Sequence, residues 1–243
     1  EVTERAITAM KDCDADCVVA LGGGSTTGLG KALALRTGVN QLCIPTTYAG
    51  SEMTPIWGLT EDGIKKTGRD NKVLPTTVVY DPTLTLTLPD SIAGPSGMNA
   101  IAHCVEAMYS ETANPIISMM AEEGVRSLAR ALPIVVKSPD NIEARSDALY
   151  GAYLSGASLG AVGMALHHKL CHALGGTLDL PHAPTHTVVL PHALAYNAPA
   201  APDAVAALSA AMGGVADPAR ALWDLAGELG APRSLAELGM AET

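Results

Sequence analysis

Short apolar runs alternate with glycine-rich or polar turns through the first third of the chain. The run at 17–21 is uninterrupted, which is typical of a parallel strand that is buried on both faces. Apolar positions within 1–11 follow the period of an amphipathic helix. We therefore predict helices over 1–11 and from Thr26 to just before Gly38, strands over 17–21, 41–44 and 76–80, and a β-hairpin formed by 56–60 and 64–67 around Glu61-Asp62-Gly63.

The pattern changes near Pro89. From Asp90 onward the strand signals disappear, and apolar residues recur at helical spacing. The predicted helices are 98–109, 115–136, 142–159, 164–174 and 185–196, followed by alanine-rich helical segments as far as Leu238. The sequence thus predicts two domains, an α/β domain over residues 1–89 and an all-α domain over residues 90–243.

Composition narrows the class of protein. A hydrophobic content of 48% is ample for a sizeable core, and a net charge of −10 argues against a nucleic-acid surface. No basic amphipathic stretch, signal peptide or membrane-length apolar run is present, so we expect neither a membrane nor a nucleic-acid partner. Five cysteines without CxxC spacing favour a reducing, cytoplasmic setting over a disulfide framework or a zinc ribbon.

Two strand ends carry glycine and small hydroxyl residues. The first predicted strand runs directly into 22–25, GGGS, and a helix follows, which is the arrangement in which backbone N–H groups meet a phosphate. The pattern departs from the dinucleotide GxGxxG motif at Thr27 and from a P-loop at Ser25. The second strand ends in PTTYAGSE, and two such ends favour a nucleotide crevice, although both can be simple capped turns. Lys65 and Lys66 can reach a phosphate or remain solvated.

Six of the seven histidines lie between residues 163 and 197. His168 and His172 are four apart and project from one helix face, and we expect Gly175-Gly176 to end that helix so that Pro181-His182 adds a third imidazole. Lys169 stands where an HExxH hydrolase needs glutamate, which excludes that zinc site. A metal or anion pocket, a proton-transfer site and a set of structural histidines remain open. We interpret three of the histidines individually as structural: His167, His186 and His192.

A polar seam runs along the first predicted helix of the second domain. Asn99, His103 and Glu106 stand at i, i+4 and i+7 on an otherwise apolar element. Because buried polar groups need partners, we expect this seam to meet the histidine cluster rather than to face solvent. The prediction is that Asn99, His103, His168 and His182 converge, with His172 beside them. Cys104 and Cys171 are expected to be core thiols.

Several separate blocks resemble one known superfamily. GGGSTTGLGKA, PTTYAGSEMT, DPTLTLTLP, GMNAIAHCVEAMYS and HHKLCHALGG with LPHAPTHTVVLPH are similar to the iron-type alcohol dehydrogenases, and most closely to their maleylacetate reductase branch. The resemblance spans nearly the whole chain. It implies a dehydroquinate synthase-like architecture with the active cleft between a dinucleotide-binding domain and an all-helical domain. It also implies that the chain is truncated at both ends.

The resemblance assigns residues to the cofactor and to a metal. NADH or NADPH would be held by Gly22, Gly23, Gly24, Ser25, Thr46, Thr47, Ser51, Thr54 and Lys65. In metal-using members one Asp and three His bind a dication, and these positions correspond to Asn99, His103, His168 and His182. A neutral amide is a poor ligand for a hard dication, so the resemblance implies an enzyme without a metal.

The branch also implies a reaction. It reduces the carbon-carbon double bond of maleylacetate to 3-oxoadipate with NAD(P)H, in the degradation of aromatic compounds by the β-ketoadipate pathway. His172 is then the expected proton donor, with the other three histidines and Asn99 on the substrate, and a homodimer is implied. Two alternatives stay open: a metal-dependent dehydrogenase for a small alcohol or aldehyde that uses Asn99 as a ligand, and a non-catalytic binding or assembly piece.

Overall fold

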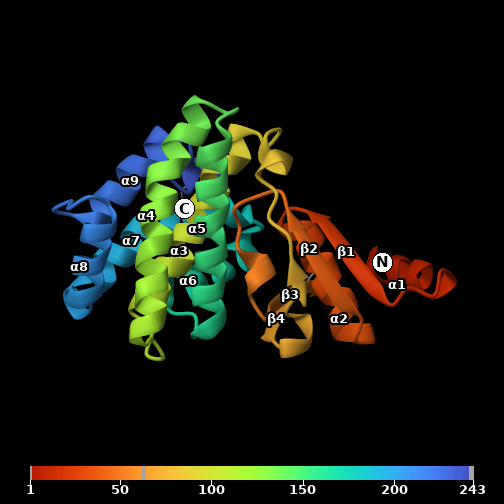
Figure 1. Ribbon diagram of the computed structural model, residues 1–243. Helices are drawn as coiled ribbons and strands as arrows, with labels where there is room; N and C mark the ends of the chain where they lie inside the picture. Colours follow the sequence, from red (N-terminus) through yellow and green to blue (C-terminus); the bar gives the residue numbers. More distant parts are fainter. Residues whose placement is uncertain (1, 62–63, 241–243) are drawn as a thin grey trace.

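The computed structural model describes residues 2–61 and 64–240, without the side chains of residues 60–65. Its strands all come before residue 79, and long helices follow from Asp90 onward. Figure 1 shows the two parts side by side, with the sheet and its helices in red to orange and the helical assembly in green to blue. This arrangement confirms the predicted fold class of an α/β part followed by an all-helical part.

A small parallel sheet forms the centre of the first part. Its strands, in the order β1-β2-β5, are β1 (Cys17–Gly22), β2 (Asn40–Pro45) and β5 (Thr77–Val78). The register pairs Gly22 with Pro45, so the carboxyl ends of β1 and β2 lie side by side. Helix α1 (Val2–Asp12) precedes the sheet, and α2 (Gly24–Thr37) begins two residues after β1 and packs on the face that carries Ala20 and Cys43.

One expectation for the first strand is wrong. The uninterrupted apolar run predicted burial on both faces of the sheet, yet Val19 is 60% exposed and Leu21 is 55% exposed. The reason lies in the strand order, because β1 is an edge strand in the described sheet and α2 covers only the face of Ala20.

The predicted hairpin is present as β3 (Ile56–Glu61) paired antiparallel with β4 (Ile64–Arg69). Its turn at residues 62–63 and the side chain of Lys65 lie outside the described residues. The guanidinium of Arg69 donates hydrogen bonds to the carbonyl oxygens of Gly160 and Val162. The hairpin is thereby attached to the helical part.

Five short 3-10 turns and seven further helices complete the architecture within the described residues. The turns are η1 (Ser51–Met53), η2 (Asn71–Val73), η3 (Pro82–Thr85), η4 (Ala198–Ala200) and η5 (Ala236–Leu238). The helices are α3 (Asp90–Met108), α4 (Pro115–Lys137), α5 (Ile142–Ala161), α6 (Leu166–Leu178), α7 (His182–Asn197), α8 (Pro202–Ala211) and α9 (Pro218–Glu228).

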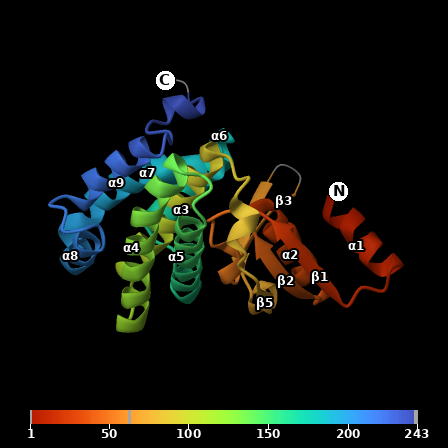
Figure 2. The same cartoon turned by 45° about the horizontal axis from the view of Figure 1, so that its top comes forward.

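Helix α3 is the centre of the helical part. Every residue from Ala93 to Met108 is buried, and α4, α5 and α7 all pack against it. Figures 1 and 2 show these helices gathered around α3, with α8 and α9 on the side away from the sheet. Among the described residues no single helix is long and apolar enough to cross a bilayer.

The helix that carries the histidine pair ends later than expected. Gly175-Gly176 does not end it; α6 continues to Leu178, and Asp179 takes the left-handed conformation with φ 51°. Glycine within a helix costs only about 1 kcal/mol, and Asp is among the few non-glycine residues that adopt the left-handed region locally. Helix α7 also begins at His182, three residues before its predicted start.

Candidate active site

In the glycine turn after β1, two of the three glycines leave no room for a side chain. Gly22 has a φ of 152°, and a Cβ there would collide with the Thr26 side chain. A Cβ on Gly23 would lie 2.8 Å from Cγ2 of Thr47, whereas Gly24 has nothing within 4 Å. Gly24 opens α2, and no side chain caps that end. The turn therefore presents an exposed helix N-terminus that a phosphate group fits.

The loop after β2 lies directly against this turn. The amide of Thr46 donates to the carbonyl oxygen of Gly22 at 3.1 Å, and Thr47 packs on Gly23. Both threonines are partly exposed, as is Ser51 in the next turn. The structure thus brings together seven of the nine residues expected to hold a dinucleotide. Thr54 is engaged elsewhere, and the side chain of Lys65 lies outside the described residues.

Thr54 lies inside the clamp of a buried lysine. Lys31 is 2% exposed, and its ammonium donates to the carbonyl oxygens of Ser51, Thr54 and Ile56 at 2.7–2.8 Å and to Oγ1 of Thr54 at 2.9 Å. Burial lowers the pKa of Lys31 to about 8, against the opposing charge of Glu52. The hydroxyl of Thr54 is therefore engaged with protein groups, and Lys31 has an architectural role that its place in the sequence does not reveal.

The same loop reaches the helical part. Tyr48 is fully buried, its amide lies 3.4 Å from Oγ of Ser96 on α3, and its hydroxyl accepts a hydrogen bond of 3.1 Å from Arg145 on α5. Gly50 has a φ of 73° and packs against the backbone of Gly156. Ser96 precedes Asn99 by one helical turn. These contacts hold the glycine-rich strand ends close to the polar seam of α3.

The polar seam of α3 meets the histidines of α6, as the sequence predicted. Nδ1 of His168 lies 2.6 Å from Oε2 of Glu106, and both side chains are almost fully buried. The rings of His103 and His168 are 5.1 Å apart, and the Asn99 amide lies 3.4 Å from Nε2 of His103. The amide of Ala165 also donates to Glu106 at 3.0 Å. Glu106 thus positions the start of α6 and the ring of His168.

The remaining predicted imidazoles lie at the outer edge of this group. His172 is half-buried, and its ring is 6.2 Å from those of His168 and His182. His182 is exposed at the first turn of α7. The cluster therefore runs from solvent at His182 to the buried pair of His168 and Glu106.

His186, which the sequence led us to interpret as structural, lies in the middle of the cluster. Its ring lies 4.2 Å from His182, 4.8 Å from His168 and 4.9 Å from His167. The side chain is fully buried, and neither ring nitrogen has a hydrogen-bond partner among the described residues. The signal was present, because His182 and His186 are four apart, but it depends on α7 beginning at His182.

The hydrogen bonds fix several protons. Because the carboxylate of Glu106 only accepts, Nδ1 of His168 carries a hydrogen and Nε2 is left without a described partner. The Asn99 amide donates to Nε2 of His103, so the proton of that ring is on Nδ1, which also has no partner. Burial, and then neighbouring imidazoles, hold the pKa values of His103 and His186 well below the ordinary range. Both rings are therefore neutral at pH 7.

The residues at the family's metal positions do not fit a tightly held dication. Asn99 offers a neutral amide whose N–H side faces His103. Two groups of described residues have possible ligand atoms within 4.8 Å of one another, and neither contains both His103 and His182. Neutral nitrogen ligands without a carboxylate leave the charge of an ion uncompensated.

The two compact groups are also poor metal sites. In the group of His167, Cys171 and His186, Nε2 of His167 lies 2.9 Å from the carbonyl oxygen of His186 and must donate to it. Burial, and then the charge of Glu106, raise the pKa of Cys171 to about 12, so it is a thiol rather than a thiolate. In the second group the Glu106 carboxylate is already bound to His168.

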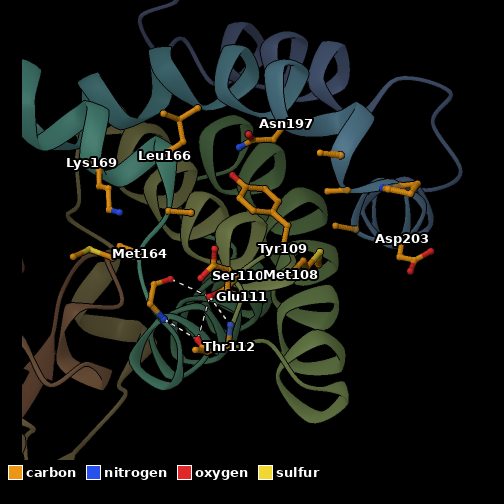
Figure 3. A pocket seen from close by; sticks show the side chains of 16 residues that line it. Met108, Tyr109, Ser110, Glu111, Thr112, Met164, Leu166, Lys169, Asn197 and Asp203 are labelled. Carbon is orange, nitrogen blue, oxygen red and sulfur yellow. Dashed lines mark hydrogen bonds between the residues drawn. The ribbon is translucent and has the colours of Figure 1, made fainter.

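A cavity of about 730 Å³ lies behind the first turn of α6. Figure 3 shows its walls: Met108 to Thr112 at the end of α3, Gly163 to Leu166 with Lys169 at the start of α6, and Asn197 with Ala200 to Ala204 at the end of α7 and beyond it. None of the histidines or glycine-turn residues lines it. The cavity is therefore separate from the candidate active site.

Comparisons with known proteins identify the family to which this sequence is similar. The family model "Iron-containing alcohol dehydrogenase" matches residues 1–82, and "Fe-containing alcohol dehydrogenase family, C-terminal" matches residues 94–243. A maleylacetate reductase from Sphingobium indicum is 61% identical over 237 residues, which are 98% of this chain and 67% of that protein.

Solved structures give the same likeness. The crystal structure of maleylacetate reductase from Rhizobium sp. strain MTP-10005 has a TM-score of 0.94 at 58% identity, covering 99% of this chain and 68% of that one. A putative alcohol dehydrogenase from Ralstonia eutropha JMP134 has a TM-score of 0.97 at 57% identity, covering 98% and 68%. The chain thus spans about two thirds of the length of these relatives.

Proposed function

The chain belongs to the iron-containing alcohol dehydrogenase family, in its maleylacetate reductase branch, and from this premise we propose that it reduces the carbon-carbon double bond of maleylacetate to 3-oxoadipate with NADH or NADPH. It is an oxidoreductase. The observation that carries the specific reaction is that the neutral rings of His103 and His186 lie in a histidine cluster beside Asn99, where a metal-dependent relative would need a carboxylate.

The cofactor side of the proposal rests on the strand ends. Gly22, Gly23, Gly24 and Ser25 hold the pyrophosphate at the N-terminus of α2, and the packing of Thr47 on Gly23 supports this assignment. Thr46, Thr47 and Ser51 line the rest of the site. Thr54 contributes by keeping the loop in place through Lys31, and Lys65 remains a proposed phosphate contact.

The substrate side needs no Lewis acid. A bound NADH or NADPH supplies the hydride that adds to the alkene carbon, and the negative charge then spreads through the conjugated ketone into an enolate. Hydrogen-bond donors can stabilise that oxygen in place of an ion. We assign this role, and the binding of the carboxylates, to His103, His168 and His182 with the amide of Asn99; His168 donates from Nε2 in its doubly protonated form, in which Nδ1–H stays on Glu106.

His172 is the proposed proton donor. It is half-buried between His168 and His182, close enough to the interior to meet the substrate and close enough to solvent to recover its proton. The proton goes to the enolate carbon, which completes the reduction of the double bond.

The proposal extends to the domain organisation, the oligomeric state and the cellular setting. We propose that residues 1–89 and 90–243 form separate domains with the reaction between them, supported by the change from strands to helices. A homodimer is proposed from the family resemblance, to be tested by light scattering. A cytoplasmic setting is supported by the five free cysteines.

A spectrophotometric assay tests the function. Maleylacetate should drive oxidation of NADH or NADPH by the purified protein, and a chelator should leave the rate unchanged. A small aldehyde serves as the control substrate and should give a much lower rate. Stoichiometric iron or zinc together with loss of activity on chelation would instead establish the metal-dependent dehydrogenase, and failure of the folded protein to bind either dinucleotide would leave a non-catalytic role.

A further inference from the structure

His186 differs from the other buried histidines, because its ring makes no hydrogen bond to a described residue. His167 is also buried, but its Nε2 donates to a carbonyl oxygen at 2.9 Å. His168 is bound to Glu106, and His103 to Asn99. Among the described histidines, only His186 has both ring nitrogens buried and without a described partner.

Such a ring is unfavourable in the protein alone. A buried N–H and a buried lone pair that bond to nothing each cost about 1–3 kcal/mol. An apolar side chain of similar size would avoid that cost and would fill the same place between α6 and α7. The fold therefore gives no reason for an imidazole at this position.

The surroundings indicate where a partner would come from. His182 is exposed, and its ring lies 4.2 Å from that of His186 one helical turn further in. On the inner side the ring of His168 is 4.8 Å away, with its Nε2 also unpartnered. The three rings thus form a series from the exposed His182 through His186 to the pair of His168 and Glu106, so a ligand bound at His182 lies next to His186.

We propose that His186 is a substrate-binding residue that donates its ring N–H to a carboxylate or oxo oxygen of a dicarboxylate substrate. This assignment deepens the proposed function and rests on it for the identity of the substrate. A neutral N–H donor is sufficient for an anionic oxygen, because hydrogen bonds to charged acceptors are stronger than those between neutral groups. The lone pair on the other nitrogen accepts a hydrogen bond from a water molecule.

Two substitutions at His186 separate binding from folding. His186→Leu removes both polar atoms at similar volume, and His186→Gln keeps a donor and an acceptor. His192→Gln, at an exposed position on the same helix, is the matched control. For each protein we would measure the unfolding temperature, KM and kcat with maleylacetate, and Kd for 3-oxoadipate by calorimetry.

We expect His186→Leu to raise KM for maleylacetate and Kd for 3-oxoadipate by about 10- to 100-fold, the range for a lost hydrogen bond to a charged group. KM for the dinucleotide should stay within about 2-fold, and the unfolding temperature should not fall, because an unpartnered polar group is being replaced by an apolar one. His186→Gln should recover most of the affinity.

Several results would overturn the assignment. A lower unfolding temperature with unchanged KM and Kd, or loss of folded protein in both variants, would make His186 a structural residue. The proposed reaction can fail separately: if the unaltered protein does not reduce maleylacetate, a weaker Kd for 3-oxoadipate in His186→Leu still supports His186 as a dicarboxylate-binding residue, and an unchanged Kd refutes it.

Discussion

Lys31 and His186 are both buried polar side chains, yet the protein treats them in opposite ways. The ammonium of Lys31 lies within 2.7–2.9 Å of four oxygen atoms, which share its three N–H donors, in a loop 20 to 25 residues further along the chain. The ring of His186 bonds to no described residue. A buried group whose hydrogen bonds are all made within the protein supports the architecture, whereas one that is left incomplete is arranged for a ligand.

The largest expected effect concerns His172, the proposed proton donor at the outer edge of the histidine cluster. His172→Ala should lower kcat by about 10²- to 10⁴-fold, the usual contribution of a positioned acid or base. Because the change lies away from the glycine turn, Kd for NADH should be unchanged in a fluorescence titration. His192→Ala is the control, and normal turnover by His172→Ala would remove His172 from the mechanism.

The second prediction concerns Lys31, the buried side chain whose hydrogen bonds are all made within the protein. Lys31→Met should destabilise the protein by about 3 kcal/mol, since it leaves buried oxygens in the loop of Ser51 to Ile56 without their donor. Urea unfolding measures the change, with Lys72→Met at an exposed position as the control. If Lys31→Met were as stable as the control while His186→Leu unfolded readily, the contrast between the two groups would be reversed.

The same contrast explains what the sequence could reveal. Strand ends, the hairpin and the spacing of His168 and His172 follow from local patterns, and the seam of Asn99, His103 and Glu106 indicated its own partner. Lys31 could not be interpreted in this way, because three of its four acceptors are backbone carbonyl groups that only the folded loop brings together. Every residue has a backbone carbonyl group, so the residue types at Ser51, Thr54 and Ile56 do not indicate that these residues accept hydrogen bonds from Lys31.

His186 was missed for a different reason. Its spacing from His182 obeys the same four-residue rule that revealed His168 and His172. The predicted helix began at Thr185, however, which left His182 outside it, whereas α7 begins at His182 directly after its N-cap residue Pro181. An error of three residues in a helix boundary therefore concealed a shared face.

The smallest expected effect tests whether the glycine turn serves the fold, as Lys31 does, or a ligand, as we propose for His186. Gly23→Ala places a Cβ 2.8 Å from Cγ2 of Thr47, so one of the two must move, and we expect dinucleotide affinity to fall by about 10-fold. Thr47→Ser removes that methyl group and should restore most of the affinity in the double variant. Gly28→Ala, where nothing lies within 4 Å, is the control and should bind as the unaltered protein does. Equal affinity in Gly23→Ala would mean that the close packing of Gly23 on Thr47 serves only the fold, and that the phosphate contact lies elsewhere along the strand ends.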